Sequence, residues 1–313
     1  MNRIGDIVGG CASLAALLEV SAYPKPGNVH RLRDFPGTRY EHFLAGCVSL
    51  APWMGALAAE GARVRDAGGD LGEVGLGAHI LGAAEDMLRW QSGGNVHLGV
   101  ILLFAPLAAA AGATAVDGFI EPAGLRGALK DVIDAATPAD TVDIYKAIGL
   151  AMSRENLGRV DELDVADPSS LRRITEEGVR PLDVFEASRS RDSISSEWAT
   201  GFSVTFTEGY PYLKEQLRGG DVNESTVNTF LRVLSLHPDS LIRRKRGDEA
   251  AWAVSEKARR VLDHGGASTV RGMSMLRELD EELSAEKGGL NPGTSADLTA
   301  ASLYVLLLSG WRP

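Results

Sequence analysis

The sequence has few of the residues that build disulfide-stapled or aromatic-rich proteins. Among its 313 residues there are two cysteines, and only 6% of the residues are aromatic. Cys11 and Cys47 lie in apolar segments without a metal-ligand spacing, so we expect two buried thiols in a reducing compartment. The scarcity of aromatic residues, combined with abundant alanine, leucine and glycine, favours closely packed helices over a β-sheet.

The sequence also has no excess of basic residues. Lysine and arginine number 32 against 42 aspartates and glutamates, which gives a formal net charge of −10. An acidic chain has no general electrostatic attraction for nucleic acid, so nucleic acid is not an expected partner. A polyphosphate ligand would need a local basic pocket or a metal ion, and clustered lysines and arginines are therefore informative here.

A signal peptide and a membrane span are not expected either. The N-terminal segment lacks a clear cleavage site. The most apolar run, residues 97–116, is interrupted by proline and glycine and begins beside a polar cluster, which predicts a buried core helix. These features indicate a cytoplasmic protein without a membrane partner.

Helical periodicity dominates the chain. Apolar residues recur at helical spacing over 4–21, and this helix should end near Ala22 because Pro24 follows. Further helices are expected over 40–64, 70–94, 95–112, 121–136, 138–151, 181–217, 223–237, 247–266, 274–289 and 294–311. We predict an all-α fold, a single catalytic domain over residues 1–313. About a dozen helices would form one compact bundle, with a polar excursion around 152–181. Small-residue-rich helices also permit a homodimer.

Within the segments expected to be helical, two finer predictions follow. The β-branched run 203–207 makes the helix over 181–217 uncertain at that point. The helix over 223–237 should begin at a capping pattern of Ser225 and Asn228, assisted by Glu224.

Polar residues gather at the expected helix ends, in segments 24–31, 40–43, 84–99, 188–193 and 291–297. Helix starts offer unpaired N–H groups and the positive end of the helix dipole, which suits anions. Asn95 is predicted to cap the helix that follows it. The basic segment 240–247 is by itself typical of a solvated face. No catalytic triad order, P-loop, dinucleotide fingerprint or zinc spacing is present.

The first of these clusters interrupts apolar helical sequence with a rigid loop. Its prolines fix the backbone, and Gly27 opens it. Lys25 and Arg31 are expected to bring positive charge to an otherwise acidic surface.

Three separate segments, taken in this order, resemble the triphosphoribosyl-dephospho-CoA synthase family. They are Pro24-Lys25-Pro26-Gly27, then Glu85-Asp86-Met87 with Gly94-Asn95-Val96-His97, then Asn291-Pro292-Gly293 with Ser295-Ala296-Asp297-Leu298. The resemblance runs over nearly the whole chain. It implies an all-helical transferase that moves the 5-triphosphoribosyl group of ATP to a ribose hydroxyl of 3′-dephospho-CoA and releases adenine.

Two departures from the family's pattern indicate a divergent branch. Leu98 stands where the family has a lysine, and Val29-His30-Arg31 replaces a Val-Asp-Arg triplet. The first alternative is therefore a phosphoribosyltransferase that uses phosphoribosyl pyrophosphate in tetrahydromethanopterin biosynthesis. A non-catalytic helical protein that binds a nucleotide or a partner is the second alternative.

Substitution at the anomeric carbon of a ribosyl donor passes through an oxocarbenium-like state. Phosphates then need cations, the sugar needs acceptor groups, and the hydroxyl needs a base. The phosphate-binding candidates are Lys25, Arg31 and the backbone near Gly27, followed by Arg243, Arg244 and Lys245. The ribose-binding candidates are Asn28, Asn95 and Ser295. The acid–base candidates are His97 and His30. The carboxylates expected to hold Mg²⁺ are Glu85, Asp86 and Asp297, with Glu41 and Asp192 as weaker options.

Overall fold

The computed structural model describes residues 3–116, 118–152, 164–165, 167 and 169–313, and over these residues the protein is all-α. Fifteen α-helices are present in this part of the chain, together with three short turns of 3₁₀ or π-helix and isolated β-bridges in place of strands. The all-α prediction is confirmed, with more helices than the dozen expected. The predicted polar excursion at 152–181 falls partly outside the described residues, and its described part contains α8 (Ser169–Glu177).

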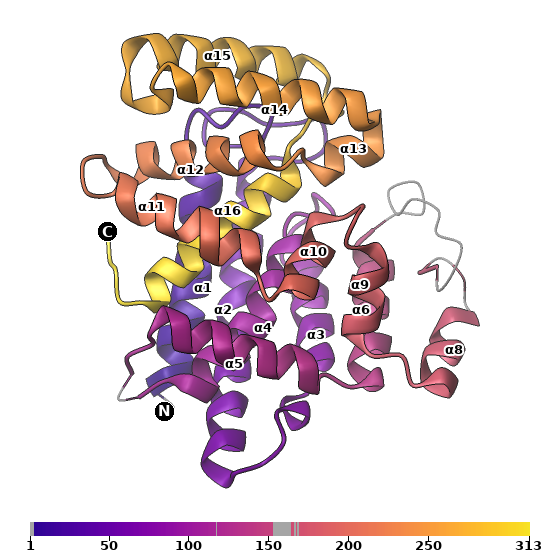
Figure 1. Ribbon diagram of the computed structural model, residues 1–313. Helices are drawn as coiled ribbons and strands as arrows, with labels where there is room; N and C mark the ends of the chain where they lie inside the picture. Colours follow the sequence, from indigo (N-terminus) through magenta and orange to yellow (C-terminus); the bar gives the residue numbers. More distant parts are fainter. Residues whose placement is uncertain (1–2, 117, 153–163, 166, 168) are drawn as a thin grey trace.

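Four helices form the centre of the molecule (Figure 1): α1 (Arg3–Ser21), α2 (Tyr40–Ala67), α4 (Leu98–Thr114) and α16 (Gly293–Leu308). Both α4 and α16 are buried nearly all round, as their uniformly apolar sequences require. Small residues let these helices approach closely. A Cβ atom on Gly61 of α2 would lie 2.2 Å from the carbonyl oxygen of Ala109 in α4. Close packing through small residues is therefore confirmed.

A second group of helices surrounds this centre, with α6, α8 and α9 along one side (Figure 1). The group comprises η1 (Leu71–Val74), α3 (Leu76–Arg89), α5 (Pro122–Ala135), α6 (Pro138–Ala151), α8, α9 (Pro181–Ser188) and α10 (Ser193–Thr200). The prediction of one helix over 70–94 is wrong. Gly75 adopts a left-handed conformation with φ 63°, and this residue separates η1 from α3.

The β-branched segment near residue 205 forms one turn of π-helix, η2 (Thr205–Gly209), which continues into α11 (Tyr210–Gln216). The carboxylate of Glu197 in α10, which is fully buried, supports this turn. It accepts hydrogen bonds from the backbone N–H groups of Val204 at 2.8 Å and Thr205 at 2.9 Å. A buried acidic side chain thus satisfies the donors that an irregular turn leaves open.

A second apolar cluster lies under the C-terminal helices. These are α12 (Val222–Leu236), α13 (Ser240–Arg246), α14 (Asp248–Asp263), η3 (Gly266–Ser268) and α15 (Val270–Ala285). In Figure 1, α14 and α15 stack across one end of the molecule beside α12 and α13. The cap predicted at Ser225 is wrong, because Asp221 accepts the N–H of Glu224 at 2.8 Å and Ser225 is buried inside α12.

The apolar helices and the cysteines are placed as expected. Residues 97–116 contain α4, a buried core helix. Cys11 and Cys47 are both buried and free. The window Ile4–Ser21 in α1 and the whole of α2 are long and apolar enough to cross a membrane by length and composition alone. Core helices of globular proteins share those features, and these two helices pack against each other in the bundle.

Candidate active site

The loop between α1 and α2 is held by two helices that follow about 200 residues later in the chain. The side chain of Asn223 in α12 accepts the N–H of Tyr23 at 2.9 Å and donates to the carbonyl oxygen of the same residue at 2.7 Å. The carboxylate of Asp280 in α15 accepts the N–H of Gly27 at 3.1 Å and lies 3.4 Å from Nε2 of His30. The loop is therefore fixed against the C-terminal helices at both of its halves.

Lys25, the cation of this loop, is buried in the protein. Its side chain is 1% exposed, and Nζ donates to the carbonyl oxygen of Glu19 at 3.0 Å while forming an ion pair with the carboxylate of the same residue. The expectation that Lys25 brings positive charge to the surface is wrong, because the acidic partner lies six residues earlier, in the apolar helix α1. A buried pair of this kind is costly to break, since each charge compensates the other.

His97 precedes the first turn of α4 and is also buried. Its Nε2 lies 3.0 Å from the carbonyl oxygen of Phe43 and 3.2 Å from Sγ of Cys47, and its backbone N–H donates to Sδ of Met87 at 3.2 Å. A carbonyl oxygen only accepts hydrogen bonds, so Nε2 carries the proton and Nδ1 keeps a lone pair. Burial, followed by the nearby Lys25, lowers the pKa of His97 to about 4. The imidazole is therefore neutral at pH 7.

Asp297 in the first turns of α16 faces the start of α4. A Cβ atom on Gly99 would lie 2.1 Å from Oδ2 of Asp297, so this carboxylate occupies the space that any side chain at position 99 would need. No described residue donates a hydrogen bond to the Asp297 side chain. Gly99 and Asp297 therefore bring the start of α4 and the start of α16 together, and these carry the second and third segments of the family resemblance.

Two further carboxylates begin neighbouring helices beside this contact. Asp192 caps α10 by accepting the N–H of Ser195 at 2.9 Å. Asp239 caps α13 through the N–H of Leu241 at 2.9 Å, and its second oxygen accepts both the N–H and the hydroxyl of Ser295, at 2.7 Å and 2.8 Å. The starts of α10, α13 and α16 therefore meet, as expected from the polar clusters at helix ends.

These acidic groups act on one another electrostatically. Burial raises the pKa of Asp297 well above its usual value, and the nearby carboxylates of Glu19, Asp239 and Asp192 raise it further, while Lys25 opposes them. Burial also raises the pKa of Glu19 and of Asp239. One lysine cannot balance the charge of four carboxylates, so the cluster is more stable when some of its carboxyl groups stay protonated. The buried carboxyl groups of the cluster therefore hold protons more readily than exposed ones.

Lys25, His97 and Asp297 share this one region. After burial, the charge of Lys25 acts on the pKa of both His97 and Asp297. The three residues come from the three separate segments on which the family resemblance depends. We call the group of Glu19, Lys25, His97, Asp192, Asp239 and Asp297 the acidic cluster.

Other residues predicted for the site are engaged in holding the loop. The N–H of Gly27 is bonded to Asp280, and His30 is 1% exposed against the same carboxylate. The side-chain amide of Asn28 donates to the carbonyl oxygen of Pro26 at 3.4 Å. Arg31 is exposed and donates to Asn223 at 3.0 Å. Their roles in binding phosphate or ribose, or as an acid–base group for His30, stay predictions.

The carboxylates predicted for Mg²⁺ are not gathered into a metal centre. Glu85 is exposed on α3, and Asp86 accepts from Nε1 of Trp53 at 2.9 Å and pairs with Arg89. Within the described residues, no group of three or more His, Cys, Asp or Glu side chains is arranged to hold a metal ion. We therefore derive no step through a protein-bound metal. Glu41, also considered for this role, is exposed at the start of α2.

Asn95 caps a helix as predicted, whereas its role toward ribose and the phosphate-binding roles of Arg243, Arg244 and Lys245 stay predictions. The side chain of Asn95 accepts the N–H of Leu98 at 3.0 Å and so caps α4. At the far end of α13, Arg243 pairs with Asp248 at 2.5 Å. Lys245 donates to a backbone carbonyl oxygen at 3.0 Å, while Arg244 is exposed. The basic residues thus form a solvated face about 10 Å along α13 from its acidic cap.

Reasoning from the sequence missed two members of the acidic cluster, Glu19 and Asp239. A signal for Glu19 was available, because one carboxylate within the apolar stripe of residues 14–20 requires a buried partner. Asp239 directly precedes the helix Ser240–Arg246, a position typical of a helix cap. Neither signal could identify which residues lie opposite.

The fold is all-helical, and the family match places the chain among the transferases. A family model described as ATP:dephospho-CoA triphosphoribosyl transferase, CitG, matches residues 6–313, and the chain belongs to this family. A 2-(5″-triphosphoribosyl)-3′-dephosphocoenzyme-A synthase from Klebsiella pneumoniae is 27% identical over 296 residues, covering 93% of this chain and 87% of that protein. A solved structure of an Archaeoglobus fulgidus protein assigned to the same kind of synthase has the same fold. Its TM-score is 0.60 at 24% identity, over 82% of this chain and 99% of that one.

Proposed function

We propose that this protein transfers the triphosphoribosyl group of ATP to a ribose hydroxyl of dephospho-CoA and releases adenine, as a cytoplasmic enzyme of coenzyme biosynthesis. The observation that carries the proposal is the meeting of Lys25, His97 and Asp297 in one acidic cluster, in a chain that belongs to the family. These residues lie more than 70 positions apart in sequence, and packing of the helix cores alone does not require them to meet.

The chemistry breaks the bond between the anomeric carbon and adenine and forms one to the acceptor oxygen. Adenine leaves with a proton, and the acceptor hydroxyl loses one. Asp297 has a raised pKa and, unlike Glu19 and Asp239, accepts no hydrogen bond from a described side chain or backbone group, so it is the candidate to carry that proton. With a pKa of about 4, His97 is a weak base and serves as a neutral imidazole that orients the site through Nδ1. The ionised carboxylates favour the cationic sugar of the transition state.

A second candidate function is favoured by one observation. Leu98, at the position of the family's lysine, is 3% exposed and packs in the main apolar core. It supplies no charge to a phosphate, which suits a donor with a different phosphate chain. A phosphoribosyltransferase that uses phosphoribosyl pyrophosphate on a pterin precursor would keep the same substitution at the anomeric carbon and release pyrophosphate.

One assay separates these candidates. The purified protein is incubated with ATP and dephospho-CoA, and separately with phosphoribosyl pyrophosphate and tetrahydromethanopterin precursors. Adenine and pyrophosphate are quantified by chromatography. We expect adenine in the first mixture, dependent on dephospho-CoA. Pyrophosphate in the second mixture alone would select the alternative donor, and binding without either product would indicate a non-catalytic protein. Titration with Mg²⁺ after chelation tests whether turnover requires that ion, as expected from the sequence. Sedimentation tests whether the protein forms the homodimer that its helices permit.

A further inference from the structure

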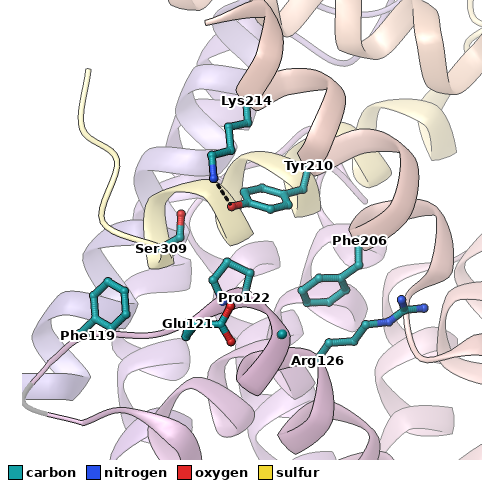
Figure 2. A pocket seen from close by; sticks show the side chains of 9 residues that line it. Phe119, Glu121, Pro122, Arg126, Phe206, Tyr210, Lys214 and Ser309 are labelled. Atoms are coloured by element: carbon teal, nitrogen blue, oxygen red, sulfur yellow. Dashed lines mark hydrogen bonds between the residues drawn. The ribbon is translucent and has the colours of Figure 1, made fainter. Parts of the chain in front are cut away.

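A hollow of about 580 Å³ lies at the opposite end of α16 from the acidic cluster (Figure 2). Asp297 and Ser309 are twelve residues apart, which corresponds to about 18 Å along a helix. The hollow is lined by Phe119, Glu121, Pro122, Ala123, Arg126, Phe206, Tyr210, Lys214 and Ser309. Its volume falls within the roughly 300–1,000 Å³ of small-molecule sites. None of these residues takes part in the function proposed above.

The walls of the hollow present aromatic rings from separate elements. Phe206 and Tyr210 form a mostly buried floor, whereas Phe119 stands 61% exposed at the rim. Phe206 belongs to the π-helical turn η2, which is held in place by the buried carboxylate of Glu197. π-helical turns are rare and occur frequently at functional sites. Glu197 therefore fixes the π-helical turn that forms this wall of the hollow.

The hollow also contains cationic groups that are free of salt bridges within the described chain. Nζ of Lys214 lies 3.5 Å from the Tyr210 hydroxyl and forms no ion pair with a described carboxylate. The guanidinium of Arg126 lies 5.6 Å from the ring centre of Phe206. The nearby Glu121 accepts the N–H of Gly124 at 2.7 Å. Its exposed carboxylate also lines the hollow, so an anion must bind on the Lys214 side.

We propose that this hollow is a second ligand site, which binds a purine nucleotide. The flat base would stack on the exposed ring of Phe119 with its edge toward Phe206, whose ring carries the Arg126 guanidinium. The phosphate would lie at Lys214. Aromatic rings bind bases through stacking, and a lysine without an ionic partner is available to a phosphate. On a chain with a net charge of −10, such a local group of cations and rings is selective for an anion that carries an aromatic ring.

Calorimetry with AMP, adenosine and inorganic phosphate tests the ligand class. AMP is expected to bind, and adenosine and phosphate should each bind at least about tenfold more weakly. Adenosine lacks the phosphate that would contact Lys214, and inorganic phosphate lacks the base that would contact the aromatic rings. Lys214→Gln is expected to weaken AMP binding about tenfold, and Phe206→Leu by a similar factor. Lys130→Gln removes an exposed lysine from α5, outside the hollow, and should leave the affinity unchanged. Lys214 is exposed, so its variant keeps the fold even if Phe206→Leu does not.

Photolabelling with 8-azido-AMP tests the position of the site. Label on peptides covering 118–126 or 205–214 supports the proposal, and Asp297→Asn should not alter it. Three results would overturn the proposal: no AMP binding at millimolar concentration, an equal effect of Lys130→Gln and Lys214→Gln, or label confined to peptides with His97 or Asp297. Turnover is measured in parallel, so that loss of the second site and failure of the proposed transferase activity are distinguishable.

Discussion

The two ends of α16 present polar groups in opposite ways. At its start, Asp297 lies among buried carboxylates that share one buried lysine. At its end, Lys214 lies exposed above aromatic rings and lacks an ionic partner in the described chain. Burial at the first end raises the pKa of Asp297 and favours proton transfer, whereas exposure at the second end leaves Lys214 open to a ligand from solvent. The same helix therefore connects a region arranged for chemistry with one arranged for binding.

Asp297→Asn should produce the largest effect on turnover, because it changes the group that we expect to carry the proton at the start of α16. The amide cannot exchange the proton that the reaction requires, so kcat should fall about 10³-fold, with a smaller change in KM. The measurement is steady-state release of adenine. The control is Lys130→Gln, which removes an exposed lysine of α5 outside both regions and should leave kcat within a factor of about two.

His97→Gln tests whether the imidazole takes part in the same proton transfer. A glutamine amide can donate to the Phe43 carbonyl in place of Nε2 but cannot act as a base, so kcat should fall much less than in Asp297→Asn. A loss in kcat as large as that of Asp297→Asn would contradict the assignment of proton transfer to the carboxylate and return it to the imidazole.

Lys25→Met should cause the largest loss of stability. The substitution leaves Glu19 without its cation in a fully buried position, and breaking such a pair costs about 3–5 kcal/mol in the free energy of unfolding. Urea denaturation measures this loss. The double variant Glu19→Leu/Lys25→Met should recover most of it, and failure to recover would show that Lys25 stabilises the loop by packing alone.

Stability should also decrease in mild acid because of His97. The pKa of His97 is about 4 in the folded protein, below the roughly 6.5 of an unfolded histidine. The unfolded state thus binds more protons between these values, and this contribution is complete above pH 6.5 and is lost as the pH falls toward 4. Between pH 7 and pH 5 it amounts to about 2 kcal/mol.

Glu19, Asp239 and Asp297 have raised pKa values, and their effect on the pH dependence of stability is opposite to that of His97. The wild type alone therefore does not isolate the contribution of the histidine. The informative quantity is the difference between wild type and His97→Asn in urea denaturation at the two pH values. An equal pH dependence in both proteins would show that His97 is not protonated differently in the folded and unfolded states.

The helices were predictable because their signals are local. Pro24 ends α1 where the sequence indicated, and the apolar run after Asn95 forms α4 with Asn95 as its cap. The break at Gly75 was missed, because a single glycine within a periodic segment is compatible with either a continuous helix or a stop.

The interior of the site was less predictable than the helices. Lys25 looked like a surface cation because its partner belongs to an apolar helix, and the partner of Gly27 is Asp280, 253 residues later. Local rules identify residues that need a partner, but they do not specify which distant helix supplies it. The hollow at the end of α16 left no motif in the sequence, since its residues come from a turn, from α5 and α11, from the π-helical segment and from the residue that follows α16.

Asn223→Ala should have the smallest effect, and it tests whether the reactive end of α16 depends on the layer of C-terminal helices. The variant loses both hydrogen bonds to Tyr23, which costs about 1–3 kcal/mol in the free energy of unfolding. The loop that carries Lys25 would then be less well fixed, and kcat/KM should fall about tenfold while AMP binding at the hollow stays unchanged. Asn223→Asp still accepts the Tyr23 N–H but cannot donate to its carbonyl oxygen, so its loss should be intermediate. Unchanged kcat/KM in a destabilised Asn223→Ala protein would mean that the loop is a structural clamp and has no influence on the chemistry.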